Sequence, residues 1–145
     1  VWFYQALARR IGYERMQEWV SKVGYGNRNI GSEEEIDSFW LTGDLRITPQ
    51  QQIEFIRRLH NNELPFSEKT IDTVKDIMIV EQTPDYTLRA KTGWALASNV
   101  GWYVGYLEQN DTIYAFATNI DIRNESDLNA RQEITRRCLK SLNLL

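Results

Sequence analysis

The sequence predicts an α+β fold in which one antiparallel sheet is flanked by helices that precede and follow it in the chain. Apolar residues recur at helical spacing up to about residue 80 and again near the C-terminus, whereas between Pro84 and residue 120 they alternate with polar residues. The tripeptide Gln109-Asn110-Asp111 interrupts this alternation with turn-forming residues, which predicts a hairpin. With 145 residues, 42% of them hydrophobic, the chain is long enough to bury a core.

The first two helices are expected over residues 2–11 and 13–23, because a glycine follows each apolar pattern, Gly12 the first and Gly24 the second. The segment 25–46 then loses its period and fills with Gly, Asn, Ser and three consecutive glutamates. This composition predicts a long surface loop, and loops of such length often carry function.

Two further helices have recognisable starts. Thr48 supplies an N-cap, Pro49 occupies the first helical position, and Gln51 completes a capping box. Ser67 caps the next helix. Four apolar residues of that helix are expected to face a core: Ile71, Val74, Ile77 and Met78.

The first strand is expected just after Pro84, with Lys91 at its end. Alternation places three of its residues on one face: Tyr86, Leu88 and Ala90. The two strands of the hairpin are expected near residues 101–107 and 112–120, and a last helix near residues 128–142. The predicted sheet is therefore antiparallel, with helices before and after it.

Charge and hydropathy exclude two classes of partner. Seventeen basic and twenty acidic residues give a net charge of -3, and the basic residues form no cluster, so no nucleic-acid partner is expected. The longest apolar runs, such as Ile77 to Val80, are far shorter than the roughly 20 residues that cross a bilayer. No membrane segment is expected in this chain.

The single cysteine and the single histidine limit the chemistry further. Cys138 alone rules out an internal disulfide and any Cys-x-x-Cys metal site, and His60 cannot form a metal site by itself, so no metal is expected. A catalytic Cys138/His60 pair would require the two side chains to be close in space. The alternative is that Cys138 packs in a helix and His60 lies near a helix end.

A more specific motif is Lys91-Thr92-Gly93, on the first predicted strand. A lysine beside a hydroxyl places a cation and a hydrogen-bond donor where a substrate carboxylate can bind, and the glycine keeps the strand edge open to a bulky ligand. Four other stretches accompany it: Tyr-Gly-Asn at 25–27, Phe-Trp-Leu-Thr-Gly-Asp-Leu-Arg-Ile-Thr at 39–48, Gly-Trp-Tyr-Val-Gly-Tyr-Leu-Glu at 101–108 and Leu-Asn-Ala-Arg-Gln-Glu-Ile-Thr at 128–135. In this order and spacing they resemble the class D β-lactamases, the oxacillinases.

The resemblance implies a β-lactamase/transpeptidase-like fold that is incomplete here. Residues 1–145 would be the C-terminal part of a single penicillin-binding/β-lactamase catalytic domain, beginning just after the serine of the family's Ser-x-Val motif. No Ser-x-x-Lys occurs in the chain, so the nucleophile and its lysine would lie upstream. The missing N-terminal half is thus an expected partner, and this chain alone is expected to be inactive.

In the family that the chain resembles, an upstream serine is acylated and an upstream lysine, carbamylated by CO2, is the general base. Bicarbonate is therefore the only cofactor-like species expected. By the same resemblance, the indole N–H of Trp40 would hold the carbamate and Leu41 would pack over it. The alternative is that both residues only fill the core beneath the loop.

The remaining roles concern the substrate. By resemblance, Lys91 and Thr92 would bind the β-lactam and help to move protons, beside Gly93, and the backbone N–H of Trp94 would form half of the oxyanion hole. Arg131 would hold the substrate carboxylate, and its alternative is a solvated helix arginine.

The sequence leaves three functions open. The first is hydrolysis of β-lactams through an acyl-serine intermediate by a periplasmic or secreted bacterial enzyme. The second is a β-lactam-sensing receptor domain that is acylated without turnover. The third, a cell-wall transpeptidase, is disfavoured by Trp40 together with Tyr25-Gly26-Asn27.

Overall fold

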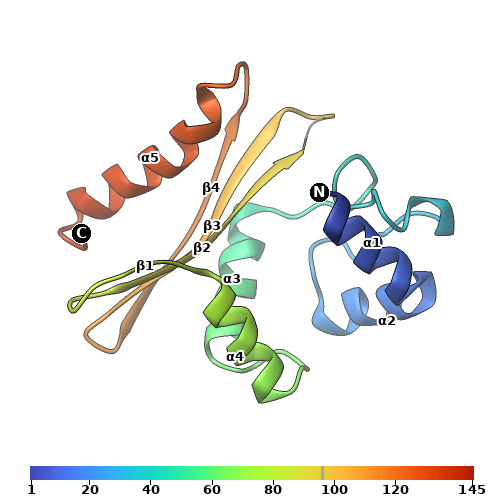
Figure 1. Ribbon diagram of the computed structural model, residues 1–145, viewed down its shortest axis with the longest axis horizontal. Coiled ribbons are helices and arrows are strands. Elements are labelled where there is room, and N and C mark those ends of the chain that lie inside the picture. The colour runs from blue at the N-terminus through green and yellow to red at the C-terminus, as the bar shows by residue number, and fades with distance from the viewer. Residues whose placement is uncertain (96) are drawn as a thin grey trace.

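A computed structural model describes residues 1–95 and 97–145 of the chain (Figure 1). In chain order its elements are α1 (Trp2–Ile11), α2 (Tyr13–Val23), the 3-10 helix η1 (Glu33–Glu35), α3 (Pro49–His60), α4 (Glu68–Ile77), β1 (Ile79–Gln82), β2 (Thr87–Ala95), β3 (Val100–Gln109), β4 (Thr112–Asp121) and α5 (Asp127–Ser141). The strands form one sheet in the order β1-β2-β3-β4, and every pair is antiparallel. The predicted α+β class is confirmed.

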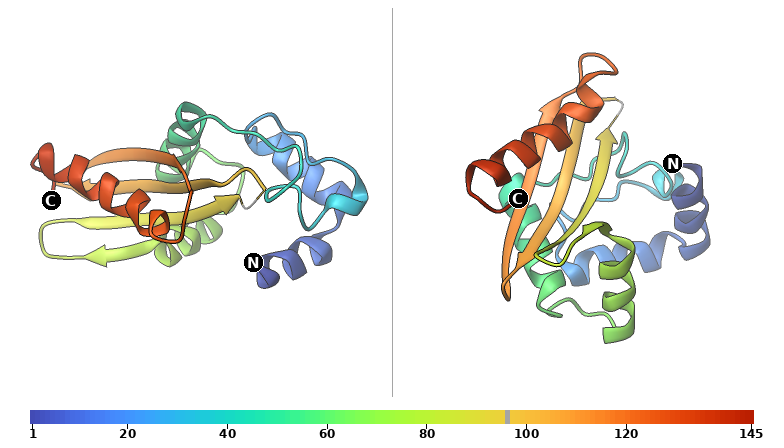
Figure 2. Two further views of the ribbon diagram at one scale, coloured as in Figure 1. Left: turned by 90° about the horizontal axis from the view of Figure 1, so that it is seen from above. Right: turned by 60° about the vertical axis from the view of Figure 1, so that its left-hand side comes forward.

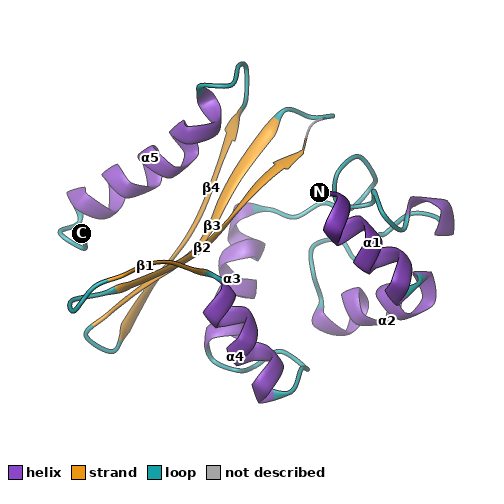
Figure 3. Cartoon of the chain, in the orientation of Figure 1, coloured by secondary structure: helices purple, strands orange, loops and turns teal. Residues whose placement is uncertain are grey.

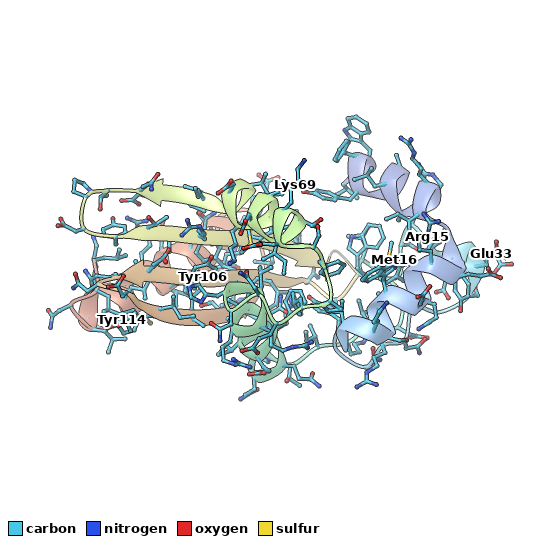
Figure 4. The ribbon with its side chains drawn as sticks, turned by 90° about the horizontal axis from the view of Figure 1, so that it is seen from below. Arg15, Met16, Glu33, Lys69, Tyr106 and Tyr114 are labelled. Carbon is cyan, nitrogen blue, oxygen red and sulfur yellow. The ribbon has the colours of Figure 1, made fainter. Side chains whose placement is uncertain are left out.

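The sheet lies between two helical layers (Figure 1 and Figure 2). Helix α5 covers one face, and α3 and α4 lie against the other, while α1, α2 and the segment before α3 lie beyond one end of the sheet. Between α5 and the sheet the core consists of Leu88, Leu107, Leu139 and Leu144. On the opposite face, Tyr106 of β3 packs among apolar residues of α2, α3 and α4 (Figure 4).

Local sequence chemistry explains where the helices begin and end. Thr48 forms the predicted capping box with Gln51, and the hydroxyl of Ser67 accepts the backbone N–H of Thr70. Helix α2 ends at Gly24, whose φ of 71° is left-handed. These two helix starts and one helix end are thus set by residues that the sequence already displays.

The β3–β4 hairpin turns through Asn110 and Asp111, with φ values of 50° and 59°. Positive φ at both central residues is the geometry of a two-residue type I′ turn, which Asn and Asp tolerate. The turn sets the register Gln109↔Thr112, which continues to Val100↔Asp121. The predicted hairpin is confirmed, with strands slightly longer than expected.

The structure differs from the expected sheet and helix faces in four places. Strand β1 was not expected, and Ile77, expected in the core, is 73% exposed because α4 ends there and only the next residue, Met78, turns inward. Lys91 does not end its strand, since β2 continues to Ala95 through unbroken pairing with β3. Cys138 is exposed, because it lies beside the stripe that α5 buries at intervals of four, Arg131, Thr135 and Leu139.

The segment 25–46 is less of a surface loop than its composition indicates (Figure 3). It contains η1 and buries Ile30 and Phe39 almost completely. Its hydrogen bonds reach the first two helices, since Gln5 Nε2 donates to the Asp37 carbonyl and the Tyr13 hydroxyl donates to the Gly31 carbonyl. The segment therefore forms one unit with α1 and α2.

Candidate active site

Strand β2, which carries the Lys-Thr-Gly motif, is paired differently along its two edges. On one side β3 pairs with the whole of β2, from Thr87 to Ala95. On the other side β1 pairs only as far as Arg89, and its last contact is the 2.8 Å hydrogen bond from the Ala90 N–H to the Met78 carbonyl. In the part of the chain that the structure describes, no strand pairs with that edge of residues 91–95. The Lys-Thr-Gly motif therefore lies on an open strand edge.

The direction of the backbone groups along this edge follows from strand geometry. Successive residues of a strand point their N–H and C=O groups to opposite sides. The Ala90 N–H points toward β1, so the N–H groups of Thr92 and Trp94 point the same way, where β1 has ended. The Trp94 N–H is thus a donor directed at the open edge.

The side chains of the motif approach the edge from two faces of the sheet. Leu88 packs against α5, and side chains alternate, so Thr92 and Trp94 lie on the α5 face. Lys91 lies on the opposite face, is exposed, and bends to the edge, where its Nζ donates to the Thr92 carbonyl at 2.8 Å. A cation and a hydroxyl therefore flank the same short stretch of open backbone.

Arg131 reaches this stretch from α5. Its Nη1 donates to the Gly93 carbonyl at 2.5 Å, and the residue is only 9% exposed. Burial lowers the pKa of the Arg131 guanidinium from its ordinary value, because the cation loses water. Its buried Nε has no hydrogen-bond partner among the described residues. A buried cation with a free donor favours an anionic ligand such as a carboxylate.

A glycine on β3 makes room for Ile122 and lies beside the stem of Arg131. A Cβ at Gly101 would lie 3.5 Å from Arg131 Cδ and 2.5 Å from Ile122 Cδ1. Sequence reasoning gave Gly101 no role. The available signal is a glycine inside an otherwise apolar strand, which is typical of a close approach by another group.

Trp40 and Leu41 lie elsewhere, on the turns that follow η1. The Trp40 ring is half-buried and meets the Phe39 ring edge to face, with centroids 4.9 Å apart. The Leu41 N–H donates to the Ser38 carbonyl at 2.8 Å. Among the described residues, no hydrogen bond, ion pair or aromatic contact joins either residue to β2 or α5. The structure thus brings Lys91, Thr92, Gly93, Trp94 and Arg131 together, and places Trp40 and Leu41 on a separate segment.

Tyr25-Gly26-Asn27 holds that segment in place. The Asn27 side chain donates to the Asp44 carbonyl at 2.8 Å and accepts the Arg46 N–H at 3.0 Å. Gly26 has φ 55°, and a Cβ there would lie 2.2 Å from the Arg46 carbonyl oxygen, so only glycine fits. Tyr25 packs on Phe55, and burial raises the pKa of its hydroxyl. These contacts fix the shape of the segment that carries Trp40 and Leu41.

Other features do not add to the site. A cavity of about 420 Å³ lies at the ends of β3 and β4 beside the first turns of α5, with Asn119, Asp121, Arg123 and Asp127 as its polar lining, and none of the predicted site residues line it. Among the described residues, no three His, Cys, Asp or Glu side chains are arranged to hold a metal. In the same residues, no helix has both the length and the hydropathy of a bilayer span.

Comparisons with known proteins agree with this geometry. Residues 1–140 match the family described as penicillin binding protein transpeptidase domain. The chain is 41% identical to β-lactamase OXA-48 of Klebsiella pneumoniae over 139 residues, which are 94% of this chain and 52% of the relative. A crystal structure of the class D β-lactamase YbXI from Nostoc superposes with a TM-score of 0.96 at 64% identity, covering 99% of this chain and 61% of that one.

A second solved structure gives the same picture. FUS-1 (OXA-85), a class D β-lactamase from Fusobacterium nucleatum, superposes with a TM-score of 0.92 at 44% identity, over 98% of this chain and 59% of that chain. The chain therefore spans about half the length of the curated relatives it matches, and about three fifths of these structures.

Proposed function

The chain belongs to the penicillin-binding protein transpeptidase domain family, with class D β-lactamases as its homologues, and we propose that it forms the C-terminal part of a domain that hydrolyses β-lactams. The observation that carries the proposal is the open edge of β2. There an exposed ammonium, a hydroxyl, a directed backbone N–H and a buried guanidinium converge within four residues of one strand. This set of groups suits a small anionic substrate with a reactive carbonyl.

In the proposed acylation step, a serine outside this chain attacks the β-lactam carbonyl. The bond from the serine oxygen to the carbonyl carbon forms, the ring C–N bond breaks, and the ring nitrogen takes up a proton. The Trp94 N–H stabilises the oxyanion together with the nucleophile's own N–H. In this proposal Lys91 and Thr92 lie next to the ring nitrogen of the bound β-lactam. There the lysine ammonium and the threonine hydroxyl can pass that proton to the nitrogen.

The proposed position of the substrate follows from its charge. A carboxylate beside the ring would bind between Thr92 and Arg131, because the guanidinium retains unpaired N–H groups next to Gly93. Charge-assisted hydrogen bonds of this kind are among the stronger ones in proteins, and the apolar surroundings of Arg131 strengthen them further. A Cβ at Gly93 would make only an ordinary van der Waals contact with Trp102 Cβ on β3, at 3.4 Å.

Deacylation is assigned to a carbamylated lysine, also outside this chain, which supplies a general base for water. We assign Trp40 to hold that anion and Leu41 to shield it from solvent. Two observations support the fit: Trp40 is half-buried, and the segment that carries it is fixed through Asn27 and Gly26. A donor held in a fixed and partly apolar place is what a buried anion requires.

The proposed partner within the domain is the N-terminal portion that the relatives possess. Helix α1 supports this, because it presents several apolar side chains to solvent: Trp2, Phe3, Tyr4, Leu7 and Ile11 are 40–77% exposed. Contiguous exposed apolar surface of this kind marks an interaction site. The proposed setting is the bacterial periplasm or the extracellular space, where class D substrates occur.

The test uses a complete class D domain that contains this chain, with benzylpenicillin as substrate. Lys91→Ala is expected to lower kcat/KM by about 100-fold or more, as the loss of a proton-transfer group does. Lys69→Ala, which changes an exposed lysine of α4 outside the sheet, is the matched control and is expected to change nothing. Equal activity of the two variants would overturn the proposal.

Mass spectrometry of the same protein separates hydrolysis from sensing. A β-lactamase loses the acyl adduct within the assay, whereas a sensor domain retains it stoichiometrically. The chain on its own is expected to form no adduct with a fluorescent penicillin, because it contains no Ser-x-x-Lys. Labelling of the isolated chain at one serine would contradict the assigned location of the nucleophile.

A further inference from the structure

Arg131 is held by contacts to three strands of the sheet. Its guanidinium donates to Gly93 on β2, its stem lies over Gly101 on β3, and its backbone is linked to Thr118 on β4 through Thr135. The first two contacts involve the side chain that the proposed function uses. The third involves two hydroxyls to which that function assigns no role.

The direction of this third link follows from counting protons. The Thr135 hydroxyl donates to the Arg131 carbonyl at 2.9 Å, and a hydroxyl has one proton to donate. The Thr118 and Thr135 oxygens are 2.7 Å apart, so in this pair Thr118 donates and Thr135 accepts. The result is a relay from Thr118 through Thr135 to the backbone of Arg131. Thr135 is 3% exposed, so water does not compete for these bonds.

The rest of α5 is anchored farther along the helix. Leu139 packs against Leu88 and Leu107, and Arg136 pairs with Glu81 at 2.8 Å. These contacts hold the helix against the sheet, but they lie one to two turns beyond Arg131. Besides the side chain of Arg131 itself, the hydroxyl relay links this part of α5 to the sheet, at Thr118 of β4.

We propose that Thr118 is a positioning residue for Arg131: its hydroxyl, acting through Thr135, sets the height and rotation of the α5 turn from which the guanidinium reaches Gly93 of β2. This proposal rests on the proposed function, in which that guanidinium binds the substrate carboxylate. The relay determines which N–H groups remain free for the ligand after Nη1 has bonded to Gly93. It acts on carboxylate recognition and leaves the chemistry at the carbonyl unchanged.

The first measurement is spectroscopic and needs no turnover. In a complete class D domain that contains this chain, the Nε–H signal of Arg131 is followed by ¹⁵N–¹H NMR, with its exchange rate with water. Thr118→Val keeps the shape and removes the hydroxyl, so the signal is expected to shift and its exchange to accelerate by about three- to tenfold. Thr118→Ser restores the hydroxyl and is expected to restore the signal.

Thr112→Val is the matched control, because Thr112 lies on the same strand, at the hairpin, and is exposed. It is expected to leave the Arg131 signal unchanged. An Arg131 signal that responds equally to Thr118→Val and Thr112→Val, or not at all to either, would overturn the proposal. So would a failure of Thr118→Ser to restore it.

The second measurement is kinetic. With benzylpenicillin, Thr118→Val is expected to raise KM about three- to tenfold with kcat within twofold, and Thr118→Ser to return KM to the starting value. A loss confined to kcat, or one that only tracks thermal stability, contradicts a positioning role. If no variant turns over any β-lactam, the proposed function fails, while the NMR comparison still decides the position of Arg131.

Discussion

Two regions of the molecule fix their functional side chains in different ways. In the sheet with α5, residues far apart in the sequence meet: the Arg131 side chain contacts Gly93 and Gly101, and Thr118 is linked to the Arg131 backbone through Thr135. In the region of α1, α2 and residues 25–46, local hydrogen bonds hold a loop in place, while the apolar face of α1 is exposed to solvent. The first region is closed by contacts within the chain. The second presents exposed apolar surface, which we assign to contact with a further segment of the domain.

The difference shows what each region determines by itself. At the open edge of β2, strand register fixes the direction of every N–H and side chain, so the geometry around Arg131 is complete in this chain. For Trp40 only the segment that carries it is fixed, and the anion assigned to it belongs to a residue outside the chain. We therefore expect bicarbonate to restore part of the activity lost by a substitution in the second region, and none of the activity lost by a substitution in the first.

The largest effect is expected for Trp40→Phe in a complete domain. Phenylalanine keeps most of the packing against Phe39 but lacks the indole N–H, so the carbamate loses a donor and forms less readily. Turnover of benzylpenicillin in low bicarbonate is expected to fall by about 1000-fold, within the range that a general base contributes. Added bicarbonate should restore part of this loss by mass action.

The control is thermal stability measured on the same samples. If Trp40 only fills the core, activity will follow the folded fraction and bicarbonate will have no effect. A flat bicarbonate titration of a fully folded variant would remove Trp40 from the mechanism and leave the second region with a structural role only.

A smaller effect is expected for Arg131→Ala, which removes the cation from the first region. Loss of a charge-assisted hydrogen bond to the substrate carboxylate should cost about 1.5 to 3 kcal/mol in kcat/KM. Bicarbonate should not restore it, which separates this variant from Trp40→Phe. Arg137→Ala, an exposed arginine on the same helix, is the matched control. Equal kinetics for both variants would make Arg131 an ordinary helix arginine.

The smallest effect concerns the ion pair that holds α5 to the edge strand β1. The Tyr86 hydroxyl, and next Arg136, hold the pKa of the Glu81 carboxyl below its ordinary value. A carboxyl whose pKa is lowered by folding stabilises the protein above its unfolded pKa, and this stabilisation is lost as the pH falls through the folded pKa.

Glu81→Gln is accordingly expected to lower Tm by about 2 °C at pH 7, since partly exposed pairs contribute about 0.5 kcal/mol. The difference from the unmodified protein should vanish under acid conditions below the folded pKa. Glu133→Gln on the exposed face of α5 is the control and should show no such pH dependence. A Tm difference for Glu81→Gln that persists unchanged at low pH would mean that packing, and not the charge, holds this contact.

The parts of the fold that sequence reasoning predicted are those set by neighbouring residues. Thr48, Ser67 and Gly24 mark helix ends through local hydrogen bonds and φ preference, and Asn110-Asp111 forms its turn without help from distant parts of the chain. Strand β1 was missed because it follows α4 with no turn residue between them. Only its pairing with β2 makes those four residues a strand.

The candidate site likewise has a part that neighbouring residues reveal and a part that depends on distant contacts. The Lys-Thr-Gly motif is contiguous, so the sequence displays it, and the resemblance to class D enzymes added Arg131 and Trp40. The link from Thr118 to Thr135 could not be found in this way. Those residues are 17 positions apart and meet only because α5 packs across β4. Gly101 is similar, because the space that it leaves is occupied by Ile122, a residue beyond the end of β4.

The open edge of β2 also has a consequence for the protein when it is free of ligand. Unpaired N–H and C=O groups on a strand edge can template association with a strand of another molecule, and natural sheets oppose this with charges, especially lysine, along the edge. Lys91 lies at this position, and its ammonium already occupies the Thr92 carbonyl. The lysine that we assign to the substrate therefore also protects the vacant edge against aggregation.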